Sequence, residues 1–169
     1  MGLESDDIDI AMDDMYGEDF AKLINDHLNN EGNLDKKRFG VIKANSDKSK
    51  HLETATIKVD GMFVDLVNLR SEKYTEDSRV PVIEIGTPKE DAYRRDLTIN
   101  SLFYNINESK VEDLTNKGVQ DLKDGVIRTP MEPFQTFIDD PLRILRAIRF
   151  SNRFNFKVVP EIVTAAQNP

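Results

Sequence analysis

Two aspartates near the start of the chain are spaced as metal ligands would be. Asp7 and Asp9 flank a single residue, and apolar residues alternate with acidic ones from there to Met12, a pattern typical of a β-strand. Residues two apart on a strand share a face, so the two carboxylates would lie side by side. Mg²⁺ prefers hard oxygen ligands, and carboxylate pairs often hold the metal ions of phosphoryl and nucleotidyl transfer. A solvated acidic strand edge would give the same pattern.

A third aspartate, Asp65, lies within an otherwise apolar run from Val64 to Leu69. An unpaired charge is costly to bury, and a metal ion shared with Asp7 and Asp9 would give this carboxylate a partner. The alternative is that Asp65 lies on the solvent face of an alternating strand.

Arginine and polar side chains follow one another in the segment 94–100. Arginine can bind phosphate through two parallel hydrogen bonds, and aspartate or asparagine can hydrogen-bond to a sugar or a base edge. Arg95, Asp96 and Asn100 are therefore candidate nucleotide-binding residues. Adjacent arginines on a helix also occur as an ordinary solvated surface.

The segment from Asp139 to Phe150 predicts a basic amphipathic helix. Asp140 is a suitable N-cap, Pro141 suits the first helical position, and the pattern continues to about Phe154. Three arginines at a spacing of three form a cationic stripe beside an apolar one, and the helix contains no acid at the i,i+4 spacing that would neutralise them. The arginines are Arg143, Arg146 and Arg149, and the apolar residues are Leu142, Ile144, Leu145 and Ile148. A triphosphate or an RNA backbone would fit this stripe, and an idle basic surface is the alternative.

Other segments indicate the fold that must position these groups. Residues 52–59 and 62–69 form two β-rich runs around Asp60-Gly61, which predicts a hairpin. The polar stretch 71–90, with two prolines and a glycine, predicts a long loop. Further predicted elements are helices over 17–28 and 91–103 and short strands over 111–114 and 126–129. The fold class expected is α/β (α+β), with a small mixed sheet that leads into an all-α region.

The net charge of −8 arises locally. Residues 1–20 contain eight acidic residues and no lysine or arginine. The whole chain has 31 acidic and 23 basic residues, so the part beyond residue 20 contains 23 of each and is neutral. The acidity therefore does not exclude a nucleic-acid partner. The absence of cysteine excludes disulfides and thiolate metal sites. No apolar run approaches the roughly 20 residues of a membrane span, so we expect no membrane partner.

Taken in order, these segments resemble the class II tRNA nucleotidyltransferases of the polymerase-β-like superfamily. The matching motifs are D-I-D at 7–9, V-D-L-V-N-L-R at 64–70, R-R-D-L-T-I-N-S-L at 94–102 and D-D-P-L-R-I-L-R-A-I-R-F at 139–150. Segments 50–56 and 121–125 are similar to the fungal members of this family.

The resemblance implies an enzyme that adds CCA to the 3′ end of tRNA from CTP and ATP. Asp7 and Asp9 would bind Mg²⁺, and Asp65 would be the third acidic catalytic residue. The positions that match nucleotide contacts are Arg95, Asp140, Arg143, Arg146 and Arg149. The resemblance also implies tRNA, ATP and CTP as partners, and a place in the mitochondrion, cytoplasm and nucleus.

The family pattern also implies a division into a nucleotidyltransferase head over 1–138 and the start of a helical neck over 139–169. Family members carry a glycine-rich G-G-x-V-R-D segment before the D-x-D pair, and base-selecting and RNA-binding parts beyond the position of Phe150. We therefore expect the 169-residue chain alone to be inactive. The alternatives are a poly(A) polymerase of the same superfamily and a non-catalytic fragment that acts as a binding partner.

Overall fold

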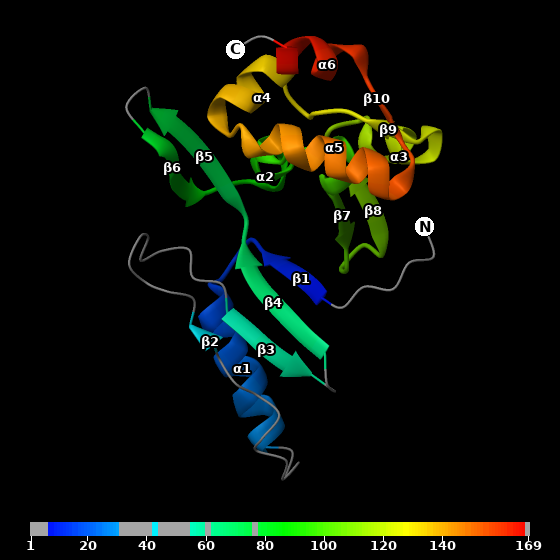
Figure 1. Ribbon diagram of the computed structural model, residues 1–169. Coiled ribbons are helices and arrows are strands. Elements are labelled where there is room, and N and C mark those ends of the chain that lie inside the picture. Colours follow the sequence, from blue (N-terminus) through cyan, green and yellow to red (C-terminus); the bar gives the residue numbers. More distant parts are fainter. Residues whose placement is uncertain (1–6, 31–41, 44–54, 60–61, 76–77, 168–169) are drawn as a thin grey trace. The chain divides into compact units, whose positions relative to one another are not determined.

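The computed structural model describes residues 7–30, 42–43, 55–59, 62–75 and 78–167. The chain forms two compact units. Unit 1 contains Met1–Arg70 and Ile83–Gly86, and unit 2 contains Ser71–Val82 and Thr87–Pro169. Figure 1 labels the helices and strands of both units.

Unit 1 is built on a four-stranded mixed sheet with the order β1-β4-β3-β2. Its strands are β1 (Asp7–Met12), β2 (Ile42–Lys43), β3 (Ala55–Val59) and β4 (Met62–Asn68). β1 is parallel to β4, whereas β3 is antiparallel to both β4 and β2. The predicted mixed sheet and the β3–β4 hairpin are thus confirmed, and the Asp60-Gly61 turn lies outside the described residues.

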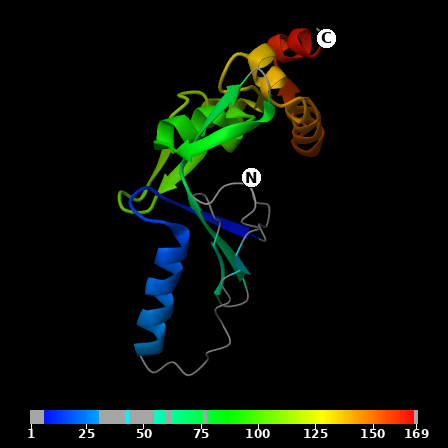
Figure 2. The ribbon, with the colours of Figure 1, turned by 90° about the vertical axis from the view of Figure 1, so that its left-hand side faces the viewer.

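Helix α1 (Gly17–Asn30) covers one face of this sheet, as Figure 2 shows. Its apolar residues recur every three to four positions and pack on alternate residues of the strands. The buried cluster contains Met12, Ala21, Ala55, Ile57, Val64 and Leu66. The helix predicted over 17–28 is confirmed. Since strand side chains alternate between faces, the residues between these core positions lie on the opposite, open face.

The start of α1 is fixed against the end of β4. A Cβ atom at Gly17 would come within 2.5 Å of the Leu66 carbonyl oxygen, so only glycine permits this approach. Two residues before the helix, the Met15 carbonyl accepts a hydrogen bond from Asn68 Nδ2 at 2.8 Å.

The prediction of a long loop over 71–90 is wrong. β5 (Arg70–Thr75) and β6 (Ser78–Ile85) pair in a two-stranded sheet, and α2 (Pro88–Arg94) follows. Pro81 is tolerated because a two-stranded sheet leaves edge positions that need no donor. Thr87 and Glu90 form a capping box, in which Thr87 N donates to Glu90 Oε2 at 2.7 Å and Glu90 N donates to Thr87 Oγ1 at 3.3 Å.

The prediction of a single helix over 91–103 is also wrong, because α2 ends at Arg94. A 3₁₀ turn (Thr98–Asn100) and β7 (Leu102–Asn105) follow it. Tertiary hydrogen bonds hold this segment out of an α-helix, since Thr98 N donates to the Arg128 carbonyl at 2.8 Å and Thr98 Oγ1 donates to Asp121 Oδ2 at 2.7 Å.

The rest of unit 2 confirms the predicted short strands. β7 pairs antiparallel with β8 (Lys110–Asp113), and β9 (Val126–Ile127) pairs in parallel with β10 (Lys157–Val158). The helices are α3 (Gly118–Asp124), α4 (Pro133–Asp139), α5 (Leu142–Phe154) and α6 (Pro160–Gln167). Among the described residues no helix is long and apolar enough to cross a membrane.

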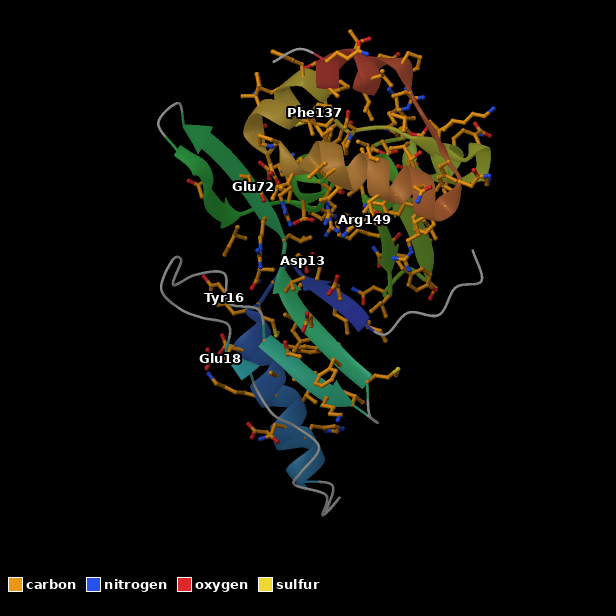
Figure 3. All side chains as sticks on the ribbon, in the orientation of Figure 1. Asp13, Tyr16, Glu18, Glu72, Phe137 and Arg149 are labelled. Atoms are coloured by element: carbon orange, nitrogen blue, oxygen red, sulfur yellow. The ribbon has the colours of Figure 1, made fainter. Side chains whose placement is uncertain are left out.

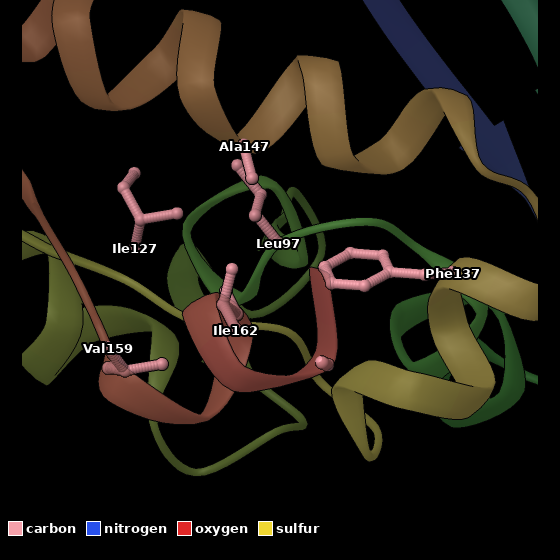
Figure 4. Packing of buried hydrophobic residues seen from close by; sticks show 7 residues of the cluster. Leu97, Ile127, Phe137, Ala147, Val159 and Ile162 are labelled. Carbon is pink, nitrogen blue, oxygen red and sulfur yellow. The ribbon is translucent and has the colours of Figure 1, made fainter. Parts of the chain in front are cut away.

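The core of unit 2 joins segments far apart in the sequence (Figure 4). It contains Leu97, Ile127, Phe137, Ala147, Val159, Ile162 and Ala165. These residues come from both sides of position 138. The domain boundary expected there rests on the family pattern rather than on packing, and it stays a prediction.

Helix α5 begins at Leu142, with Pro141 and not the predicted Asp140 as its N-cap, because Asp140 is the C-cap of helix α4; α5 also exposes more apolar surface than its pattern suggests. One residue before that N-cap, Asp140 Oδ1 accepts a hydrogen bond from Leu142 N at 3.0 Å. Ile144, Ala147 and Phe150 pack on the core. Leu142, Leu145 and Ile148, by contrast, are 64%, 62% and 58% exposed. The predicted apolar stripe is therefore divided between a packed and an exposed side.

We expect a pH-dependent contribution to stability from Asp113, which precedes α3. Burial raises the pKa of this carboxyl, but hydrogen bonds from Val119 N at 2.9 Å and Thr115 Oγ1 at 2.8 Å, with further backbone donors, lower it below its ordinary value of 3.8. Because the folded-state pKa is depressed, the stabilisation is present above pH 3.8 and is lost as the pH falls through the folded value.

Urea unfolding of wild type and Asp113→Asn tests this expectation. The variant should be less stable at about pH 6, and the difference should shrink below about pH 4. A difference in the free energy of unfolding that stays constant across this range would contradict it.

Candidate active site

Two of the predicted carboxylates lie side by side on the open face of the unit 1 sheet. The parallel register pairs Asp9 on β1 with Asp65 on β4, and the antiparallel register places Thr56 on β3 opposite Asp65. Asp9 is exposed, whereas Asp65 is half-buried. Thr56 Oγ1 donates a hydrogen bond to Asp65 Oδ1 at 2.6 Å. The result is a polar row across three strands, on the face opposite α1.

Asp7 occupies a strand position that belongs to the same row. It pairs with Phe63 in the β1–β4 register, two residues before the Asp9–Asp65 pair. Alternation along a strand gives positions 7 and 9 the same face. The Asp7 side chain lies outside the described ones, so its role as a ligand stays a prediction.

The donors on this face fit a divalent cation such as Mg²⁺. Asp9 and Asp65 offer carboxylate oxygens, which are the ligands that this ion prefers, and the ion usually takes its remaining ligands from water and substrate phosphates. No three acidic or histidine side chains converge on one point among the described residues.

In unit 2, the two adjacent arginines of the candidate segment 94–100 share a buried carboxylate. Asp91 is 1% exposed, and its Oδ2 accepts hydrogen bonds from Arg94 Nε at 3.0 Å and Nη2 at 2.8 Å. Its Oδ1 accepts from Arg95 Nε at 2.9 Å. Arg95 Nη1 also donates to the Asn100 carbonyl at 3.3 Å, and the guanidinium lies 5.3 Å from the centroid of the Phe103 ring.

Asp96 connects this segment to helix α5. It is buried, and its Oδ2 accepts a hydrogen bond from Arg146 Nε at 2.6 Å. Its Oδ1 accepts from Asn100 Nδ2 at 3.1 Å. Both Asp96 oxygens thus accept hydrogen bonds inside the protein. Asp96 therefore orients Arg146 and Asn100, and direct contact of these three residues with a nucleotide stays a prediction.

The other residues of the α5 stripe differ in their surroundings. Arg143 is largely buried, with its Nη2 3.4 Å from Glu72 Oε2 and its Nε 3.9 Å from Asp140 Oδ2. Arg149 is exposed, and its guanidinium lies 4.9 Å from the centroid of the Phe150 ring. Glu72 and Arg149 are labelled in Figure 3, on β5 and α5. Of the three stripe arginines, Arg146 and Arg149 are thus the more accessible.

Sequence reasoning did not single out three residues that hold the candidates in place. They are Thr56, Glu72 and Asp91. A signal existed for Asp91, which precedes Arg94 and Arg95 by three and four residues, the spacing at which helical side chains meet. No such local signal existed for Glu72, because its partners lie 22 and 71 residues away.

Comparison with known families gives a match over most of the chain. Residues 1–128 match the family described as the Poly A polymerase head domain. This range includes the aspartate row and the arginines around Asp91.

Two curated relatives match the chain over its whole length. The CCA tRNA nucleotidyltransferase, mitochondrial, of Saccharomyces cerevisiae is 54% identical over 172 residues, which are 100% of this chain and 32% of that protein. The protein of the same name from Candida glabrata is 52% identical over 176 residues, again 100% of this chain and 32% of that protein. The chain spans about a third of the length of the curated relatives it matches. Poly(A) polymerase I of Escherichia coli is 46% identical, but over 45% of this chain only.

Solved structures agree in fold. A CCA-adding enzyme in an apo form matches with a TM-score of 0.78 and 32% identity, over 98% of this chain and 36% of that one. Complexes of a CCA-adding enzyme with ATP and with CTP match at 30% identity, with TM-scores of 0.69 and 0.67. A tRNA nucleotidyltransferase with a primer tRNA and an incoming ATP analog matches at 28% identity, with a TM-score of 0.68. Each of these three covers 98% of this chain and between 33% and 41% of the matched one.

Proposed function

Because this chain belongs to the enzyme family of the Poly A polymerase head domain, we propose that it carries the nucleotidyl-transfer site of a CCA-adding enzyme. The reaction would add two CMP and then one AMP to the 3′ end of tRNA, and release pyrophosphate at each step. The observation that carries the proposal is the pairing of Asp9 with Asp65 on the open face of the sheet. A pair of carboxylates with a purely structural role would not need the solvent exposure that Asp9 has.

The aspartate row would hold the divalent cation, with Asp7 and Asp9 as its ligands and Asp65 beside them. Mg²⁺, when bound there, would supply Lewis-acid activation of the primer 3′-hydroxyl and neutralise charge on the triphosphate. Thr56 restrains Asp65 through the 2.6 Å hydrogen bond, so this carboxylate enters the reaction already oriented. The exposure of Asp9 lets its carboxylate reach a cation without opening the core.

The arginines of unit 2 would bind the triphosphate. Arg95 and Arg146 are held by Asp91 and Asp96, so their orientation is set before a nucleotide arrives. Donors fixed in this way stabilise developing charge without reorganising during the reaction. Arg149 and Arg143, with Asp140 just before α5, would add further nucleotide contacts within unit 2.

The names of the relatives support partners and location as well. Matched structures are described as complexes with ATP, with CTP and with a primer tRNA, and these ligands are the partners we propose for this chain. The two fungal relatives are named as mitochondrial, which supports a mitochondrial location. Cytoplasmic and nuclear locations stay predictions.

Poly(A) synthesis is the second candidate, because the matching family is described by that activity. The identity of 54% over the whole chain, against 46% over 45% of it, favours CCA addition. The two functions differ in their product, since one adds three defined nucleotides and the other a run of adenylate.

A chimeric enzyme tests the proposal. Residues 1–169 replace the matching third of the Saccharomyces cerevisiae relative, and labelled CMP and AMP incorporation into tRNA lacking its 3′ end is measured with Mg²⁺ present. We expect ordered addition of CCA. The 169-residue chain alone, assayed in parallel, is expected to show no incorporation.

Each other outcome has a definite meaning. Runs of adenylate would support poly(A) synthesis, and a folded chimera that adds nothing would support a non-catalytic binding role. Robust CCA addition by the 169-residue chain alone would contradict the expected dependence on further segments.

A further inference from the structure

A buried carboxylate on α2 distributes its two oxygens between two neighbouring arginines. Arg94 approaches Asp91 Oδ2 through Nε and Nη2, at 3.0 and 2.8 Å. Arg95 approaches Oδ1 through Nε and Nη2, both at 2.9 Å. Asp91 is thus a partner of both guanidiniums at once, and at 1% exposure it has almost no contact with solvent.

A second carboxylate continues this network to helix α5. Glu72 on β5 accepts a hydrogen bond from Arg94 Nη1 on Oε1 at 3.0 Å and one from Arg143 Nη2 on Oε2 at 3.4 Å. Ion pairs therefore connect Arg95, Asp91, Arg94, Glu72 and Arg143 in sequence, all within unit 2. The network thus joins three separate elements, α2, β5 and α5.

The network leaves Arg95 fixed and yet accessible. Its guanidinium is restrained by Asp91, by the Asn100 carbonyl and by the Phe103 ring, while its side chain keeps 33% exposure. Arg94 and Arg143 are more enclosed, at 23% and 12%. A restrained guanidinium with one accessible edge can meet a phosphate without loss of further rotamer freedom.

We propose that Asp91 is a positioning residue, which acts through Arg95 to orient the triphosphate of the incoming nucleotide. This inference rests on the proposed function. Asp91 itself is too buried to touch a substrate, so it is not a catalytic residue. Its effect must pass through the arginine, and this dependence can be measured.

The test compares Asp91→Asn with wild type in the Saccharomyces cerevisiae chimera. Asparagine keeps the shape but removes the charge that both guanidiniums share. We expect kcat/KM for CTP and ATP to fall on the order of 100-fold, since misplacing a positioned group by about 1 Å has effects of that size. The KM for the nucleotide should rise, whereas the KM for tRNA should stay at its wild-type value. A general loss of folding would not separate the two substrates.

A double-mutant cycle with Arg95→Ala tests whether Asp91 acts through the arginine. The double variant should be no slower than Arg95→Ala alone, because the group that Asp91 orients is already absent. Fully multiplicative effects of the two substitutions would overturn the proposal.

Two further variants keep the test decisive. Asp91→Glu retains the charge but moves the carboxylate by one methylene, and should lower kcat/KM about tenfold. Asp124→Asn removes an exposed carboxylate of the same unit and should behave as wild type. Wild-type kcat/KM for nucleotide in folded Asp91→Asn or Asp91→Glu would refute the positioning role alone. An inactive wild-type chimera would instead count against the proposed function.

Discussion

Replacing Asp9 with asparagine is expected to lower CMP and AMP incorporation by the chimera about 1,000-fold, which corresponds to roughly 4 kcal/mol of transition-state stabilisation. The carboxylate is exposed on the open face of the sheet, beside Asp65, so the change removes the proposed ligand without disturbing the core. The melting temperature should therefore stay at its wild-type value. The measurement is single-turnover incorporation into tRNA lacking its 3′ end.

Asp13→Asn is the matched control for this prediction. Asp13 is exposed and follows Met12, the last residue of β1, so it lies outside the β1–β4 register that pairs Asp9 with Asp65. It should leave incorporation unchanged. A Mn²⁺ titration of the 169-residue chain gives an independent measure, in which the double variant Asp7→Ala/Asp9→Ala should bind the ion more weakly than wild type does. Equal Mn²⁺ affinity in the two proteins would contradict the metal assignment.

The strand positions of the aspartates could be predicted because local patterns determine them. Alternation over β1 and the hairpin signal before β4 place the aspartates on strands, and an apolar face on one side leaves the other side polar. The order and the register of the strands could not be read in the same way. The contact between Asp9 and Asp65 joins positions 56 residues apart through a parallel pairing that no local pattern encodes.

The arginines were found by residue type, but their surroundings were not. Asp91, Asp96 and Glu72 fix the guanidiniums through contacts that depend on the packing of α2, β5 and α5. The loop expected over 71–90 hid two of these elements. Its two prolines and its glycine suggested irregular backbone, although Thr87 and Glu90 carry the capping signal of α2.

Leu97→Ala is expected to destabilise unit 2 by about 2 to 5 kcal/mol. Leu97 is 0% exposed and lies between Asp96 and Thr98, so its side chain anchors the arginine-bearing segment in the core. The truncation leaves a cavity lined by neighbours such as Ile127. Hydrogen exchange of backbone amides in unit 2 measures the loss, as a lower free energy of opening.

The control is the same substitution on α5. Leu145 is 62% exposed, so Leu145→Ala removes little buried surface and should change the free energy of opening by less than about 0.5 kcal/mol. An equal loss at both positions would contradict the distinction between the buried Leu97 and the exposed Leu145.

The two hydrophobic cores are completed at different points of the chain, which sets an order for folding on the ribosome. Among the described residues, the buried cluster beneath the aspartate row ends at Leu66, whereas the cluster around Leu97 extends to Ala165. Roughly 100 residues separate these points, so at bacterial or eukaryotic elongation rates of about 5 to 20 residues per second the delay is roughly 5 to 20 s. During that interval the nascent chain carries a sheet able to fold and a following segment whose apolar side chains have no partners. Chaperones that bind exposed apolar segments would find their substrate in this second part of the nascent chain.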